Sequence, residues 1–278
     1  MNGFPTIVRL TLHEARRKKV LVATLACGLA MLGLFAIAFF FVSRDLGHKS
    51  GLPLVQRRLM LNFFIMAGLY GVNFLMVMTS VLLPVDTLSG EIASGVMQTV
   101  ATKPIRRWEI VMGKWLAHAM VLIGYVLLLT CGVLLIARTI SGFTPPNVTR
   151  GIPLMLLEGL VLLTLSIAGG ARMSSIANGV TVFGLYGLAF VGAWTEQIGT
   201  MVGNATARSI GTAASLLMPS ESMWQLAAWN MQPPLMRELQ LTPFSPASVP
   251  NAAMVLWTVG YVVLTLIVAL RGFARREL

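Results

Sequence analysis

The chain has 278 residues and a formal net charge of +11; 56% of its residues are hydrophobic and only 11% are charged. Because a soluble domain carries about 25% charged residues, this composition excludes an ordinary water-soluble protein and indicates that lipid surrounds most of the chain. The positive charge does not indicate nucleic-acid binding, since no motif of interleaved aromatic and basic residues accompanies it. Basic residues that flank membrane spans account for it.

The N-terminal segment, residues 4–19, has the composition of an amphipathic helix. Its apolar members are Phe4, Ile7, Val8, Leu10 and Leu12, and its basic members are Arg9, Arg16, Arg17, Lys18 and Lys19. Charged residues interrupt the apolar stretch, so we do not expect a cleavable signal sequence. We expect a helix that lies in the cytoplasmic headgroup layer before the chain enters the bilayer.

Six stretches are apolar for long enough to cross a bilayer, which takes about 20 residues in helical form. They are residues 20–43, 59–85, 116–137, 152–171, 173–195 and 252–270. A seventh stretch, residues 198–218, carries Arg208 near its middle, where a charge is costly; we interpret it as re-entrant or interfacial. The fold predicted for residues 1–278 is therefore a single transmembrane domain, an all-α integral membrane protein with six spanning helices.

The distribution of lysine and arginine predicts the orientation. With a cytoplasmic N-terminus and six alternating spans, 13 of the 21 basic residues fall on the cytoplasmic side and 8 on the outer side, whereas the acids divide equally. The positive-inside rule therefore favours a multi-pass protein of the plasma (inner) membrane with both termini in the cytoplasm. A seventh span would place the basic tail outside, against the same rule.

The segment between the fifth and sixth spans, residues 196–251, is expected outside the cytoplasm. Within it, residues 219–229 (PSESMWQLAAW) indicate a short amphipathic helix at the lipid–water boundary, anchored by tryptophan. Such a helix could close the outer mouth of a pathway or bind an extracytoplasmic partner, and the sequence leaves both open.

The loop between the second and third spans, residues 86–114, has an unusual organisation. Residues 91–99 have helical character, and Gly90 and Gly95 are expected to allow close backbone approach. Pro104 ends the helix, and a turn with paired arginines, Arg106 and Arg107, leads into the third span near Lys114. We expect a rigid projection on the cytoplasmic face that another protein can bind.

This loop resembles the signature of ABC-2-type transporter permeases. An acid is followed four residues later by glycine, then by a short hydrophobic helix, a Pro-x-x-Arg turn and a Gly-Lys pair that opens the next span. In this sequence the matching residues are Glu91, Gly95, Pro104, Arg107, Gly113 and Lys114. The chain departs from the pattern at residues 96–100, where VMQTV replaces a leucine-rich stretch.

The resemblance implies that residues 91–102 are a coupling helix that docks into a cleft on a separate ABC ATPase subunit, with the N-terminal helix packed beside it. Two permeases and two ATPases would form the transporter, as a homodimer or a heterodimer of permeases, and would export a substrate that the sequence does not identify. The residues expected to act in ATPase coupling are Gly90, Glu91, Gly95, Thr102, Pro104, Arg106, Arg107 and Lys114.

The chain is not expected to hydrolyse ATP. It has no G-x-x-x-x-G-K-[ST] motif, since Gly113 and Lys114 are followed by Trp115. ATP and magnesium would therefore bind to the partner ATPase, and no cofactor is expected in this chain.

Glu158 is an acid inside a predicted span, which makes it a candidate for a substrate or proton pathway. The alternative is that it pairs with Arg150 or faces interfacial water. An ATP-coupled module that acts on an extracytoplasmic partner without moving a substrate is an alternative to the exporter. An ion-coupled secondary transporter is disfavoured, because Glu158 alone would serve as its coupling group within a span.

Overall fold

The computed structural model describes residues 3–48, 53–95, 106–239 and 248–275, and within these ranges the protein is helical without any β-strand. The helices are α1 (Gly3–Arg17), α2 (Lys19–His48), α3 (Leu54–Leu82), α4 (Ser89–Ala93), α6 (Arg107–Ser141), α7 (Val148–Gly170), α8 (Ser175–Val202), α9 (Ala205–Leu217), α10 (Ser220–Met231), α11 (Pro234–Leu239) and α12 (Ala252–Ala274).

Among the described residues, six helices are long and apolar enough to cross a membrane: α2, α3, α6, α7, α8 and α12. The predicted all-α membrane fold is thereby confirmed, although several boundaries were wrong. Helix α6 begins at Arg107 rather than at residue 116, because backbone hydrogen bonding continues past the charged residues at which an apolar window stops. Helix α3 ends at Leu82 rather than at residue 85, just before Pro84, which cannot donate a backbone hydrogen bond.

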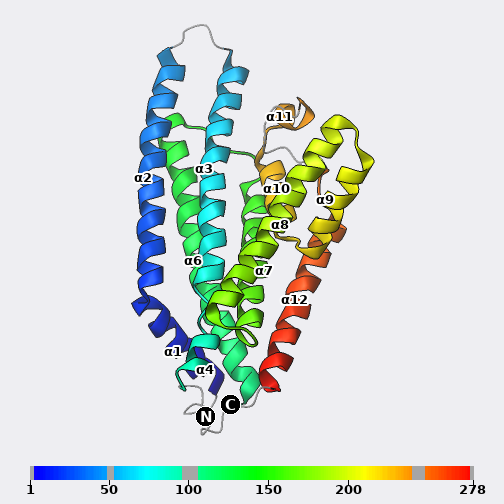
Figure 1. The fold of residues 1–278 in the computed structure, drawn as a ribbon. Helices are drawn as coiled ribbons and strands as arrows, with labels where there is room; N and C mark the ends of the chain where they lie inside the picture. Colours follow the sequence, from blue (N-terminus) through cyan, green and yellow to red (C-terminus); the bar gives the residue numbers. More distant parts are fainter. Residues whose placement is uncertain (1–2, 49–52, 96–105, 240–247, 276–278) are drawn as a thin grey trace.

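The spanning helices form an elongated bundle in which α3 and α7 are the most buried and α2 and α12 the least (Figure 1). Helices α1 and α4 lie at the end of the bundle where α12 also finishes, which we call the α4 end (Figure 1). The first span, α2, therefore begins at the end where the last span, α12, finishes, as an even number of spans requires. Exposed apolar side chains on the outer helices, such as Leu34 of α2 and Leu256 of α12, form surfaces suited to lipid.

Close packing rather than the hydrophobic effect holds helices together in lipid, because lipid is as apolar as the side chains. Gly28 shows how α2 meets α6: a Cβ at this position would lie 2.9 Å from Leu129 Cδ2. Ile65 and Leu69 of α3 and Leu129 of α6 are fully buried in the same cluster. The glycine therefore sets how closely these helices approach.

The seventh apolar stretch is not a span, because the chain reverses within it. Gly203 ends α8 with φ of 73°, a conformation that favours glycine, and the Asn204 side chain then caps α9 through the Ala207 N–H at 3.1 Å. Helix α9 has 13 residues and packs back along α8, with Gly192 of α8 directly against Ala214 of α9. A helix of this length is too short to cross a bilayer.

Helix α10 differs from the expectation of an amphipathic helix at the lipid boundary. It packs along α7 inside the bundle, and Trp224, predicted as a membrane anchor, is 3% exposed. The Trp224 ring lies edge-on to the Tyr70 ring of α3, with centroids 5.6 Å apart. The predicted interfacial position was wrong because the residues next to a tryptophan in the chain do not distinguish a buried ring from one at the membrane surface.

Candidate functional site

At the α4 end, α1 lies against the beginning of α6. Its buried residues, Ile7, Thr11 and Ala15, recur every fourth position and so share one face of the helix. A Cβ at Gly113 of α6 would lie 2.8 Å from Ile7 Cγ2, so the glycine allows this contact. The predicted N-terminal helix is confirmed, and its inner face is occupied by α6.

Helix α4 covers the beginning of the segment, residues 91–102, in which the coupling helix is expected. It begins at Ser89 and ends at Ala93, and Gly95 follows with φ of 74°, a left-handed conformation that ends a right-handed helix. Thr102 and Pro104 lie outside the described residues. Regular helix is therefore interrupted at Gly95, where the chain turns, and residues 96–102 of the expected coupling helix lie outside the described residues.

The roles expected of the two glycines also change. A Cβ at Gly90 would meet Asp86 Cβ at 3.5 Å, an ordinary contact, and a Cβ at Gly95 would meet no described atom within 4 Å. Close backbone approach is therefore not the reason for either glycine within the part of the chain that the structure covers. At Gly95 the reason is the positive φ.

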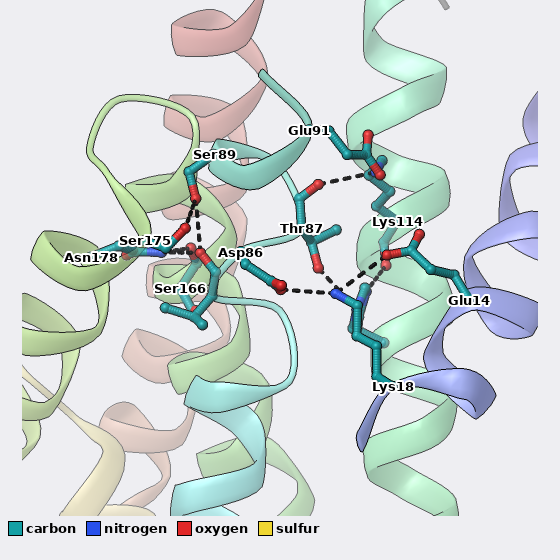
Figure 2. A network of polar contacts seen from close by, with 12 residues as sticks. Glu14, Lys18, Asp86, Thr87, Ser89, Glu91, Lys114, Ser166, Ser175 and Asn178 are labelled. Carbon is teal, nitrogen blue, oxygen red and sulfur yellow. Dashed lines mark hydrogen bonds and ion pairs between the residues drawn. The ribbon is translucent and has the colours of Figure 1, made fainter. Parts of the chain in front are cut away.

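The Glu91 carboxylate of α4 forms an ion pair with the Lys114 ammonium of α6 (Figure 2). The Lys114 side chain is 5% exposed and the Glu91 side chain 20%, so water screens this pair less than it would a surface pair. Two residues of the predicted motif are thus in contact, and the pair connects α4 to the beginning of the third span.

The same ammonium group holds the turn between α3 and α4. Lys114 Nζ donates to the Thr87 carbonyl at 3.1 Å, and the Thr87 hydroxyl lies 3.2 Å from His118 Nε2. His118 Nδ1 lies 2.8 Å from the Lys114 carbonyl oxygen, which can only accept a hydrogen bond, so Nδ1 carries a proton. In the neutral ring Nε2 then has no proton and accepts from the Thr87 hydroxyl. The α3–α4 turn is therefore bonded to α6 at two places.

A second ion pair joins this turn to the N-terminal helix. Lys18, between α1 and α2, lies 2.8 Å from Asp86 and 3.3 Å from Glu14 (Figure 2). Burial lowers the pKa of Lys18, but the hydrogen bond and negative charge of Asp86, with Glu14, raise it more, so its pKa lies above the usual value. Lys18 was expected only as one of several headgroup-facing basic residues.

Helices α7 and α8 hold the other side of the turn. The Ser89 and Ser175 hydroxyls lie 2.8 Å apart, and the Asn178 amide donates to the carbonyls of Ser166 at 2.7 Å and Val85 at 3.3 Å (Figure 2). Asn178 is fully buried, where an unmade hydrogen bond would be costly. The residues around α4 are thus connected to α1, α6, α7 and α8.

The paired arginines are exposed and do not contact Glu91. The Arg106 backbone N–H lies 3.4 Å from the Glu109 carboxylate, at the beginning of α6. Arg107 donates to the Ala274 carbonyl at 2.9 Å, at the end of α12, where a helix carries partial negative charge. Arg107 therefore connects the third span to the sixth.

Glu158 occupies a different site. It lies near the middle of α7, because the helix begins at Val148 rather than at residue 152, and it is fully buried. Its bonded neighbour is Asn73 of α3, whose Nδ2 donates to Glu158 Oε1 at 3.3 Å. The expected pairing with Arg150 or with interfacial water is wrong, because the carboxyl group faces the interior.

Sequence reasoning missed several members of these sites: Lys18 and Asp86, Thr87, Ser89 with Ser175, and Asn178. Lys18 and Asp86 are 68 residues apart, and no local spacing shows that they meet. A polar residue in an otherwise apolar span, such as Asn178, was the one available signal.

Comparison with known families agrees with this architecture. Residues 6–278 match the family described as ABC-2 family transporter protein. Because the match covers nearly the whole chain, the protein belongs to this family. It is an ABC-2-type permease, a multi-pass membrane subunit of a transporter, and the family in general implies an ABC ATPase as partner. A comparison with curated proteins finds no matching sequence.

Proposed function

We propose that this protein is the permease of an ATP-binding cassette exporter, driven by a separate ATPase subunit that docks at the α4 end. The observation that carries the proposal is the Glu91–Lys114 ion pair, which joins the short loop helix α4 to the spanning helix α6. The chain also belongs to a family of transport subunits. The substrate pathway would lie in the bundle, and two permeases with two ATPases would complete the transporter.

Coupling requires that the ATPase bind one permease conformation better than another. A partner that displaces α4 would act on α3 through the short turn at residues 83–88 and on α6 through Lys114. The Ser89–Ser175 contact would carry the same displacement to α8. Because several helices are bonded to one small element, a local push becomes a rigid-body movement of those helices.

The surface offered to the partner follows from the same contacts. Glu91 is engaged by Lys114, whereas Ala93 and Ser94 at the end of α4 are exposed. We infer that the ATPase contacts α4 at Ala93 and Ser94, and that Glu91 acts by holding α4 in place. Glu91, expected to act in ATPase coupling, would then do so as a positioning residue.

The orientation follows from charge. The α4 end carries Lys18, Lys114 and Arg107, and the positive-inside rule places such an end in the cytoplasm. Both termini of this plasma (inner) membrane protein would then lie in the cytoplasm. The cytoplasm is also where an ATPase subunit has access to ATP.

Cross-linking tests the docking surface. The chain is co-expressed with an ATPase from its own operon, with the native cysteines Cys27 and Cys131 replaced by serine and a single cysteine introduced by Ser94→Cys. A cysteine reagent of short span should then join the permease to the ATPase. The matched control is Ser209→Cys, exposed on α9 away from the α4 end, which should give no such product.

An activity measurement completes the test. Ala93→Arg should reduce co-purification of the ATPase while the permease remains folded, because the side chain is exposed. Equal co-purification and equal ATPase activity for Ala93→Arg and wild type, together with no Ser94→Cys product, would show that the ATPase docks elsewhere or does not bind.

A further inference from the structure

Two carboxyl groups are buried on two helices that pack together, α7 and α10, in the part of the bundle away from α4. Glu158 belongs to α7 and Glu221 to the beginning of α10, and they are 0% and 6% exposed. The charge of Glu221 acts electrostatically on Glu158. Glu221 was not expected to meet Glu158, because 63 residues of chain separate them and no local pattern connects them.

The register of α10 against α7 is well defined. Met231, at the end of α10, packs on Gly151 near the beginning of α7, where a Cβ would lie 2.6 Å from the methionine sulfur. Glu221, at the other end of α10, therefore lies farther along α7, at the level of Glu158. The Trp224 contact with Tyr70 holds the same helix against α3.

The groups around the pair supply hydrogen-bond donors but no positive charge. Asn73 of α3 donates to Glu158, and Tyr186 of α8 donates to Glu221; Tyr70 of α3 is the remaining titratable neighbour. In the described ranges neither carboxyl group forms an ion pair with a lysine or arginine. Burial raises the pKa of Glu221 to about 7.

Three oxygen atoms of this cluster have no hydrogen-bond partner among the described residues: Glu158 Oε2, Glu221 Oε2 and Asn73 Oδ1. All three side chains are more than nine-tenths buried. Buried polar atoms normally have partners, and a missing one indicates an unseen donor or ion. Two carboxylates in a low-dielectric interior cannot both stay charged without such a group.

We propose that Glu158 and Glu221 form a binding site for one small monovalent cation, a proton or an alkali-metal ion, held between α7 and α10 with Asn73 beside it. The cation would satisfy the free carboxyl oxygens and remove one unit of negative charge. Two carboxyl groups and one amide oxygen fall short of the six to eight oxygens that a calcium site requires. The site does not depend on the proposed ATPase contact, which lies at the α4 end.

Occupancy would be linked to the position of α10. If α10 moves away from α7, the two carboxyl groups separate, their repulsion falls and the affinity for the cation falls with it. By linkage, binding of the cation would favour the conformation in which α10 packs on α7.

Infrared spectroscopy of the full-length protein in lipid nanodiscs tests the site, with the carbonyl band of protonated carboxyl groups as readout. The titration is done in choline chloride, where protons are the ligand, and repeated in sodium chloride and potassium chloride. In choline, the wild type should titrate in two steps separated by more than about one pH unit, as coupled sites do. Glu158→Gln and Glu221→Gln should each leave a single step, and Glu238→Gln, at an exposed residue of α11, should leave the two steps unchanged.

The salts distinguish the two cations. Loss of the protonated band on adding sodium or potassium, but not choline, assigns an alkali-metal ion; a band insensitive to all three salts assigns a proton. The proposal is overturned if wild-type protein shows no protonated carboxyl band at any pH and no response to sodium or potassium. It is also overturned if the band persists unchanged in both glutamine variants, with size-exclusion profiles that confirm their folding.

Discussion

Lys114 of α6 is buried with its ammonium group paired to Glu91 of α4, although 23 residues separate them in the chain. The ion pair holds the Glu91 carboxylate against α6, where it is mostly buried. Because Lys114 lies near the start of a spanning helix, any movement of α4 would change the environment of its ammonium group.

The first prediction concerns this pair. Glu91→Ala leaves a buried ammonium group without its charged partner, and we expect it to lower the free energy of unfolding by about 1–3 kcal/mol. The measurement is thermal unfolding in detergent. The double variant Glu91→Ala with Lys114→Met removes both charges and should recover most of the loss, but it should not recover ATPase coupling.

Equal stability of the single and double variants would contradict this reading. It would mean that Lys114 finds sufficient other partners, such as the Thr87 carbonyl, when Glu91 is absent.

The second prediction concerns the contact between α1 and α6. Gly113→Ala places a Cβ 2.8 Å from Ile7 Cγ2, a branched side chain that cannot move aside easily. We expect a destabilisation of about 1–3 kcal/mol from overpacking, and faster proteolysis of α1 as it leaves α6. Gly124→Ala in the same helix, where a Cβ meets no described atom within 4 Å, should be neutral or up to about 1 kcal/mol more stable.

The third prediction concerns Lys18 and Asp86. Because the folded-state pKa of Lys18 is raised, its ion pair stabilises the protein below the ordinary lysine pKa, and this contribution is lost as the pH rises through the raised value. Lys18→Met should therefore reduce the loss of stability above about pH 10.5. The Asp86 side chain is 51% exposed, so at neutral pH we expect an effect of only about 0.2–1 kcal/mol.

Salt provides the check for this pair. The difference in thermal midpoint between wild type and Lys18→Met at neutral pH should shrink as sodium chloride is raised, because exposed charges are screened. A difference that is independent of salt would show that lost packing of the lysine stem, rather than its charge, is responsible.

The fourth prediction concerns Glu221. Its folded-state pKa is raised from 4.5 to about 7, so the folded protein binds more protons than the unfolded chain between these values. The free energy of unfolding should therefore fall as the pH rises from about 4.5 to about 7. Glu221→Gln should reduce this slope, whereas Glu238→Gln should retain it in full; an unchanged slope in Glu221→Gln would assign it to another group.

The predicted architecture succeeded where local composition decides the structure. Six helices must satisfy their backbone groups internally in lipid, so apolar runs of sufficient length were enough to place them. The amphipathic N-terminal helix was predicted from the same kind of local pattern. The boundaries were less accurate, as at Arg107, because a charged side chain ends an apolar window without ending a helix.

The sequence by itself determined the six spanning helices, the expected orientation, and the segment in which Glu91 and Lys114 lie. Only the tertiary structure decided that these two residues pair, that Lys18 meets Asp86, and that Glu221 joins Glu158 inside the bundle. The physical reason is that hydropathy and helical period are properties of neighbours in the chain. The partner of a buried charge is set by how helices distant in sequence pack, and that information is absent from any local window.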